Sequence, residues 1–261
     1  MATHNALLII DPQQDFCSPE GALFVPGAVE DIHRLVEFIE RKGTTIEQIF
    51  VTIDSHPVND ISHPNFWRDA EGNLPPPFTS ISLADVQAGR WIPQFEPERV
   101  EWYLAQLEQQ GQFPHVIWPE HCLMHSQGAS IDNTLLQALR RWSRSTGKQY
   151  QTVVKGTCPF TEHFGIFQAQ IPLPDYPETQ LNTALINALM QYDRIYLAGE
   201  ARSHCVATSL KQAMDFAPAL AQKMIVLTDC MSDVTGLGHL AAPIYAEAQA
   251  KGIPLIVSSD A

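Results

Sequence analysis

The chain has 261 residues, of which 45% are hydrophobic and 17% are charged, so it carries enough apolar material for a large core and is not a disordered polypeptide. Its formal charge is −13 and its isoelectric point is near 5.1. Because no basic stripe offsets this acidic excess, composition argues against nucleic acid or an anionic membrane as partner and favours a small-molecule substrate.

The N-terminal sequence and the cysteines bear on the cellular compartment. The start, MATHNALLII, has no basic segment followed by a cleavable apolar stretch, and no window approaches the roughly 18 apolar residues of a membrane span. The five cysteines are scattered and form no CxxC pair, which fits a reducing compartment better than a disulfide framework. We therefore expect a cytoplasmic protein.

Short apolar runs alternate with helical spacing along the chain, which predicts a parallel sheet covered by helices. We expect strands over 6–10, 48–53, 115–118, 152–155, 194–199, 224–229 and 254–257. We expect helices over 29–41, 131–144, 181–191, 205–216 and 240–250. The predicted fold class is α/β: a three-layer α/β/α sandwich of Rossmann-like type with a mostly parallel sheet and right-handed crossovers.

The alternation lapses between residues 57 and 114, where the triple proline of DAEGNLPPPF continues neither a strand nor a helix. We interpret the chain as one domain, 1–261, with an insertion at about 57–114 that contains a helix over 98–110. Four aromatic side chains of the insertion, Phe66, Trp67, Phe78 and Trp91, supply apolar mass. A lid or an oligomer contact is one interpretation of the insertion, and plain packing is the other.

The segment AGEARSHCV carries Cys205 from the end of an apolar strand onto the start of a helix. The unpaired N–H groups and partial positive charge of a helix start favour a thiolate and can hold an oxyanion, so this position suits a nucleophile. A small buried hydrophobe is the alternative interpretation of this cysteine.

Two further polar residues directly follow apolar strands: Asp11 after ALLII and Lys155 after TVV. Ligands bind at the carboxyl ends of parallel strands, so these two residues and Cys205 are expected to form one site. Asp11 would shuttle the proton of the thiol, and Lys155 would supply a fixed positive charge. Taken singly, Asp11 also suits a turn or helix cap, and Lys155 a solvated strand end.

A metal site is suggested by Asp54 and His56, which lie two residues apart at a strand end, with His121 of WPEHC completing the set. One carboxylate and two imidazoles suit a divalent ion, Zn²⁺ first and Fe²⁺ or Mn²⁺ as alternatives. Surface or structural roles for these histidines remain open.

In its ordered motifs the chain resembles the isochorismatase-like cysteine hydrolases, and within them the nicotinamidase branch. The motifs span nearly the whole chain: DPQQDF, Asp54 with His56, WPEHC, Lys155 with Gly156, and the turn from Gly199 to Cys205. The resemblance implies that Asp11, Lys155 and Cys205 form a catalytic triad. It also implies an oxyanion hole from the backbone N–H groups of Ala201 and Cys205, with a cis peptide between Glu200 and Ala201.

The same resemblance assigns Asp54, His56 and His121 to a metal that holds a pyridine nitrogen directly or through water. His63 lies near a fourth histidine of some members but is out of register, so we leave it out of the set. Phe16 and Trp118 match aromatic walls that sandwich the substrate, and Phe160 and Phe164 are further wall candidates; filling of the core is the alternative role. The resemblance also implies a homo-oligomer.

The chain departs from common nicotinamidase sequences in three places. His125 and Ser126 stand where the family typically has glycine and threonine, GTCPFTEHFGIF replaces a tyrosine-containing stretch after Lys155, and the insertion is long. These departures bear on the substrate rather than on the basic chemistry.

The predicted function is therefore a cysteine amidohydrolase that releases ammonia from a small planar carboxamide, with nicotinamide to nicotinate as the leading reaction. One alternative is a related hydrolase acting on a carbamoyl or ureido compound, which would lack the metal. Isochorismatase activity would leave Cys205 idle. A non-catalytic binding protein on the same fold is the alternative from another class.

Overall fold

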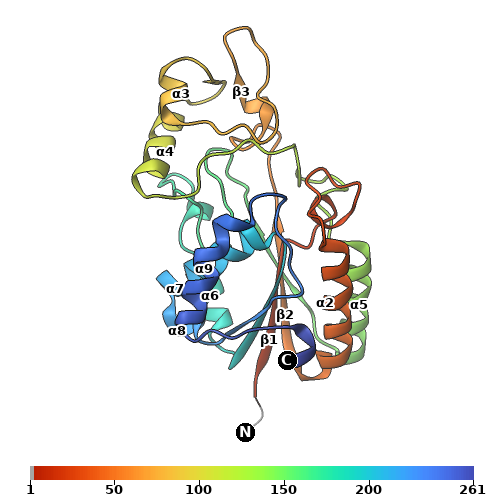
Figure 1. Cartoon of the computed structure of the whole chain (residues 1–261). Coiled ribbons are helices and arrows are strands. Elements are labelled where there is room, and N and C mark those ends of the chain that lie inside the picture. The colour runs from red at the N-terminus through yellow and green to blue at the C-terminus, as the bar shows by residue number, and fades with distance from the viewer. Residues whose placement is uncertain (1–2) are drawn as a thin grey trace.

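The computed structural model describes residues 3–261, and a six-stranded parallel sheet forms its centre (Figure 1). The strand order is β5-β2-β1-β6-β7-β8, and every neighbouring pair is parallel. The strands are β1 (Asn5–Ile10), β2 (Ile46–Asp54), β5 (Gln151–Lys155), β6 (Arg194–Gly199), β7 (Met224–Leu227) and β8 (Leu255–Ile256). All six residues of β1 are buried, as the apolar run ALLII predicts for a central strand covered on both faces.

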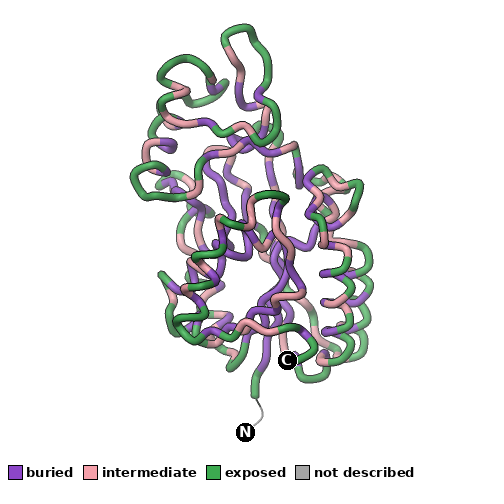
Figure 2. The backbone as a smooth tube through the Cα atoms, viewed as in Figure 1, coloured by how far each residue is buried: buried purple, intermediate pink, exposed green. Residues whose placement is uncertain are grey.

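Helices cover both faces of the sheet. One layer contains α2 (Ala28–Lys42) and α5 (Asn133–Thr146), which pack against each other. The other contains α6 (Thr183–Leu189), α7 (Ala207–Phe216), α8 (Pro218–Ala221) and α9 (Gly238–Ala250). Figure 2 shows buried residues concentrated in the sheet, while α2 and α5 alternate between buried and exposed residues as amphipathic helices do. The predicted three-layer α/β/α sandwich is confirmed.

The predicted strand over 115–118 is wrong, whereas the other six predicted strands are present. This segment forms only a single bridge, between Val116 and Ser80, and does not join the sheet. Its N–H groups instead serve the insertion, since Ile117 donates to Thr79 and Trp118 donates to Ser62. The run is apolar because Ile117 is buried in the packing of the insertion, a context that periodicity does not distinguish from a sheet.

The insertion lies beyond the carboxyl ends of the strands and has an apolar cluster of its own (Figure 1). It contains the short antiparallel pair β3 (Trp67–Arg68) and β4 (Ile92–Pro93), and the helices α3 (Leu83–Gln87) and α4 (Pro97–Gln109). The cluster consists of Ile61, Phe66, Trp67, Ile81, Val100, Tyr103, Leu104, Leu107, Ile117 and Ile171. The helix expected over 98–110 is present as α4. The division into one domain with an insertion stays a prediction.

Within residues 3–261, no helix combines the length and the apolar character that crossing a membrane requires.

Candidate active site

The three residues predicted to act together meet at the carboxyl edge of the sheet. Lys155 at the end of β5 places its Nζ 2.9 Å from Oδ2 of Asp11, which directly follows β1. The same nitrogen lies 3.9 Å from Sγ of Cys205. All three side chains are buried, with exposed fractions of 0% for Asp11, 3% for Lys155 and 6% for Cys205. The structure therefore brings an acid, a cation and a thiol into one enclosed cluster.

Asp11 is held by a neighbouring strand. Its N–H donates to Oγ1 of Thr52 at 2.9 Å, and the Thr52 hydroxyl donates to Oδ1 of Asp11 at 2.5 Å. Thr52 lies in β2, and the parallel register of β1 and β2 sets it beside the end of β1. Sequence reasoning missed Thr52, because a threonine inside a strand is ordinary and only the strand register reveals its partner.

Cys205 lies on a single wide helical turn, Arg202–Val206 (labelled η4), between β6 and α7. The peptide between Glu200 and Ala201 is cis, as the resemblance implies. Within residues 3–261 the Ala201 N–H has no hydrogen-bond acceptor, so it is free to serve a substrate oxygen.

The position of Cys205 at a helix start favours a thiolate, whereas its burial acts in the opposite direction. Burial raises the pKa of the Cys205 thiol well above its usual value, and Lys155 only partly opposes this effect. The neighbouring Asp11 raises that pKa further. Burial also raises the pKa of Asp11, against the opposing charge of Lys155. Burial therefore favours the protonated thiol, and Asp11 and Cys205 both contact Nζ of Lys155.

Lys155 remains a cation in spite of its burial. Burial by itself lowers its pKa, but the charges of Asp11 and Asp54 outweigh that effect and hold the pKa well above the usual lysine value. Asp54 makes the second contact, with its Oδ1 at 3.0 Å from Lys155 Nζ. Gly156 is required at the next position, because its φ is +78° and a Cβ there would collide with Oδ1 of Asp54.

Asp54 also joins this cluster to a group of histidines. Its Oδ2 lies 3.0 Å from Nε2 of His56 and 3.9 Å from Nε2 of His121. His56, His63 and His121 each offer a ring nitrogen, and these nitrogens all lie within 4.8 Å of one another. His63, which we left out of the predicted ligand set because of its sequence register, thus lies with these histidines. Its Nε2 is 3.3 Å from Nδ1 of His121.

The donor set fits a divalent ion. Nδ1 of His63 is buried without a hydrogen-bond partner in the described part of the chain. Burial lowers the pKa of His121 to about 4 and lowers that of His63 as well, so both rings carry the lone pairs that bind a metal. Burial also lowers the pKa of His56, but Asp54 and Asp60 outweigh it and hold this pKa well above the usual value. The carboxylates therefore favour positive charge at this position.

Backbone and carboxylate groups orient two of the rings, as partners of ligating histidines commonly do. The Nδ1 of His56 lies 3.0 Å from Oδ2 of Asp60, and Nδ1 of His121 lies 2.8 Å from the Pro119 carbonyl oxygen. Asp60 is fixed in turn by the N–H and hydroxyl of Ser62, which both donate to its Oδ1. Sequence reasoning missed Asp60, although its position four residues after His56 was a usable signal.

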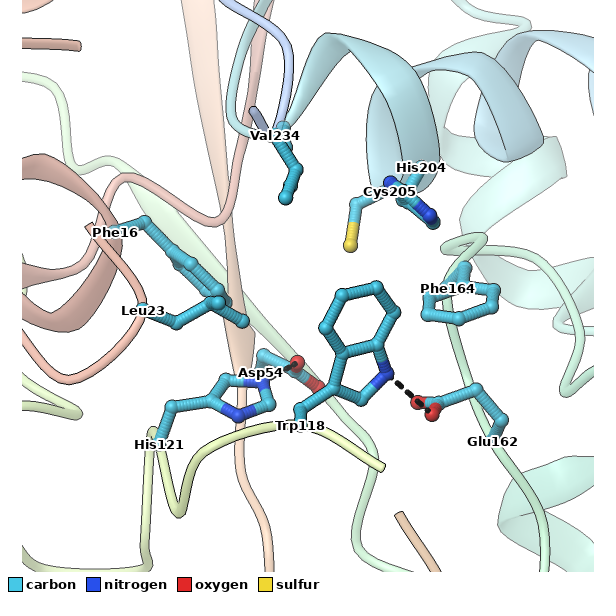
Figure 3. Close-up of a pocket in the computed structure, with 11 residues that line it drawn as sticks. Phe16, Leu23, Asp54, Trp118, His121, Glu162, Phe164, His204, Cys205 and Val234 are labelled. Atoms are coloured by element: carbon cyan, nitrogen blue, oxygen red, sulfur yellow. Dashed lines mark hydrogen bonds and ion pairs between the residues drawn. The ribbon is translucent and has the colours of Figure 1, made fainter. Parts of the chain in front are cut away.

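A mostly apolar pocket opens beside Cys205 (Figure 3). Phe16 and Trp118 line it as predicted, and Phe164 joins them. Phe160 does not line the pocket, because it packs against Phe66 and Tyr176 instead. The pocket is lined by Phe16, Leu23, Asp54, Trp118, His121, Glu162, Phe164, Ala201, His204, Cys205 and Val234. The cavity measures about 20 Å³, room for roughly one water molecule, so a ring-sized ligand requires its walls to separate.

Glu162 and His204 are pocket residues that sequence reasoning missed. The Trp118 indole N–H donates to Oε2 of Glu162 at 3.3 Å, and burial raises the pKa of Glu162 to about 7. The His204 ring lies edge-on to Trp118, with ring centres 5.1 Å apart, and burial lowers its pKa to about 4. His204 directly precedes Cys205, which was a usable signal, whereas Glu162 lies in a loop that carries no periodic pattern.

The loop after WPEHC has no glycine where the family typically has one, but its backbone still adopts a conformation that favours glycine. His125 has a φ of +66°, in the left-handed region that favours glycine. The loop is tied to the first motif, since Oδ2 of Asp15 accepts from the Cys122 N–H at 2.6 Å.

No protein-family model matches the chain. The nicotinamidase of Escherichia coli is 26% identical to it over 98% of this chain and 96% of that protein. The nicotinamidase of Saccharomyces cerevisiae is 22% identical over 97% of this chain and 99% of that protein. The solved structure of this yeast enzyme has a TM-score of 0.65 at 21% identity, over 97% of this chain and 99% of that one. A pyrazinamidase of Pyrococcus horikoshii in complex with zinc has a TM-score of 0.58 at 20% identity, over 97% and 99%.

These comparisons support an enzyme of the amidohydrolase class. The resemblance inferred from the motifs is confirmed: the chain is similar over nearly its whole length to nicotinamidases and has their isochorismatase-like fold.

Proposed function

We propose that the chain is a cysteine amidohydrolase that releases ammonia from a small planar carboxamide, with conversion of nicotinamide to nicotinate as the leading reaction. The observation that carries this proposal is the contact of Lys155 with both Asp11 and Cys205 at the base of an aromatic pocket. Nothing in the triad is missing, which argues against a non-catalytic binding protein.

The nucleophile is Cys205. Asp11 takes the thiol proton while Sγ attacks the amide carbonyl carbon, and the N–H groups of Ala201 and Cys205 hold the oxygen that becomes negative. As the C–N bond breaks, Asp11 returns the proton to the departing ammonia. Water then attacks the thioester with Asp11 as base, which releases the carboxylic acid and restores the thiol. Lys155 stays protonated throughout and stabilises the negative charge of the reacting groups.

The walls of the pocket select a flat substrate. Phe16 and Trp118 face the same narrow space, and stacking on their rings favours a planar heteroaromatic group. Phe164 and His204 each pack edge-on against the Trp118 ring, and they make a tilted ring contact with each other. The sulfur of Cys205 points toward the space between Phe16 and Trp118 (Figure 3), so a ring held there would have its carboxamide beside the thiol.

Asp54, His56, His63 and His121 would hold a divalent metal. Zinc is the leading candidate, supported by the zinc-bound pyrazinamidase neighbour and the imidazole-rich donor set, with iron and manganese as alternatives. When bound, the ion supplies a positive charge that can orient a ring nitrogen or a water molecule. Asp54 would separate that charge from Lys155, because its Oδ2 faces His56 and its Oδ1 faces Lys155.

A panel of amides tests this function. The purified chain is assayed for ammonia release from nicotinamide, other heteroaromatic carboxamides, and carbamoyl and ureido compounds, with and without a chelator. We expect the fastest release from a heteroaromatic carboxamide and a loss of activity on chelation. A metal-free enzyme that prefers a carbamoyl or ureido compound would favour the alternative hydrolase, and no release from any compound would favour the binding protein.

We further propose that the chain is cytoplasmic and forms a homo-oligomer, both of which agree with a small-molecule salvage enzyme. Gel filtration with light scattering tests the oligomeric state.

A further inference from the structure

Glu200 is a buried acid directly before Ala201, next to the proposed oxyanion hole, and the mechanism above does not use it. Its exposed fraction is 0%, and that of its neighbour Asp31 in α2 is 2%. Asp31 is a close enough neighbour to raise the pKa of the Glu200 carboxyl. Two carboxylates cannot donate to one another, so a hydrogen bond between these two side chains requires a proton.

The hydrogen-bond partners of the carboxyl oxygens of Glu200 and Asp31 indicate where that proton lies. Among residues 3–261, Oε1 of Glu200 and Oδ2 of Asp31 have no hydrogen-bond partner if both carboxyl groups are deprotonated and can only accept. The other oxygens are occupied, since Oε2 of Glu200 accepts from the Ser232 N–H at 3.2 Å and Oδ1 of Asp31 accepts from Arg34 at 2.6 Å. One proton between the two orphaned oxygens satisfies both. Arg34 forms an ion pair with Asp31, whereas Glu200 has no cationic partner of its own, so we assign the proton to Glu200.

Hydrogen bonds hold the backbone on either side of Ala201. The Glu200 N–H donates to the Ile10 carbonyl at 2.8 Å, and the Arg202 N–H donates to the Ser232 carbonyl at 2.8 Å. Ser232 therefore holds this segment at two points: its N–H donates to the Glu200 side chain, and its carbonyl accepts from the Arg202 N–H.

We propose that Glu200 is a neutral positioning residue whose carboxyl group donates its proton to Asp31 and thereby fixes the Ala201 N–H for the substrate oxygen. The catalytic part of this inference rests on the proposed function, whereas the protonation of Glu200 does not.

Other ionisable groups surround the pair and contribute to its electrostatics. They are Asp31 and Arg34 from α2, Cys17 from α1 (Gln14–Cys17), Arg202 from η4, Asp233 from the loop after β7, and Tyr245 from α9. Asp233 is paired with Arg202 at 2.7 Å, so its charge is largely compensated. Burial and Asp31 together raise the pKa of Glu200 well above 4.5.

The pH dependence of unfolding tests the protonation. Above pH 4.5 the unfolded chain releases the Glu200 proton and the folded chain keeps it, so stability from this group is lost as pH rises toward the folded pKa. The unfolding equilibrium constant should rise by about tenfold per pH unit through this one group. Glu200→Gln keeps a donor toward Asp31 and an acceptor for Ser232 but cannot titrate. Its free energy of unfolding in urea should therefore lack this pH-dependent loss between about pH 5 and 8.

A matched control is Glu37→Gln, at an exposed glutamate of the same helix α2, which should follow the wild-type pH profile. If the Glu200→Gln profile is parallel to the wild-type profile, or if Glu200→Gln fails to fold, Glu200 is not a neutral donor and the inference is overturned.

Steady-state kinetics test the positioning role. Glu200→Leu removes both hydrogen bonds and should lower kcat by about tenfold or more with KM within about twofold, because the oxyanion donor matters only in the transition state. Glu200→Gln should restore kcat to within about threefold of wild type. Equal losses in the two variants would overturn the positioning role. If the wild-type chain hydrolyses no amide, the proposed function fails, and the unfolding profiles still decide the protonation of Glu200.

Discussion

The site has two halves that are built differently, and Asp54 belongs to both. The proposed catalytic half consists of Asp11 and Lys155, at the ends of β1 and β5, and of Cys205, on the turn η4 that follows β6. The metal half, made of three histidines, comes from loops around the insertion. The sheet fixes the first half through strand register, whereas the second depends on loop packing and on carboxylate and carbonyl partners. We therefore expect the first half to control bond breaking and the second to control metal and substrate binding.

The largest effect is expected at the nucleophile. Cys205→Ala should lower amide hydrolysis by at least about 10³-fold, because no other group in the pocket can form the thioester. Ammonia release measures the activity, and metal content and thermal unfolding should stay close to wild type. Cys158→Ala is the matched control at a buried cysteine that does not line the pocket. Activity of Cys205→Ala within tenfold of wild type would rule out covalent catalysis.

Asp11→Asn comes next and separates proton transfer from binding. The amide cannot accept the thiol proton, so kcat should fall by about 10²-fold to 10⁴-fold while KM changes little. The substitution also removes a charge partner of buried Lys155, so some loss of stability is expected in urea unfolding. A rise in KM with unchanged kcat would move Asp11 from catalysis to substrate binding.

His63→Ala tests whether the loop half is a metal site with four ligands. Metal content after dialysis should fall, with metal affinity reduced by about 10-fold to 100-fold, and KM should rise more than kcat falls. The rate at which iodoacetamide alkylates Cys205 should stay the same, because the catalytic half is held by the sheet. His33→Ala, at an exposed histidine of α2, is the control. Unchanged metal stoichiometry in His63→Ala would remove His63 from the ligand set.

The smallest effect is expected at the pocket wall. Trp118→Leu keeps an apolar side chain but loses the flat ring, so KM for nicotinamide should rise by about 3-fold to 10-fold with kcat nearly constant. Phe160→Leu should leave KM unchanged, because Phe160 packs in the insertion and away from the pocket. Equal KM values for all three proteins would show that stacking on Trp118 contributes nothing to binding.

Local sequence was enough to predict that Asp11, Lys155 and Cys205 lie together. Asp11 and Lys155 directly follow apolar runs, Cys205 lies on the turn after another, and parallel strands carry such residues to the same edge of the sheet. Asp54 and His56 could be identified for the same reason, since they end β2 or lie just beyond it. The apolar run at 115–118 shows the limit of this signal, because burial in the insertion produces the same pattern as burial in a sheet.

The sequence by itself determined the order of the strands along the chain, the three-layer fold and the residues at the strand ends, because hydrophobic periodicity and chain direction are local properties. Only the tertiary structure decided that His63 and Asp60 join the histidine group, that Glu162 supports Trp118, and that Glu200 meets Asp31. The raised pKa of the Cys205 thiol also depends on the tertiary structure, because burial causes it. These properties arise from burial and from contacts between segments far apart in the chain, which no local pattern encodes.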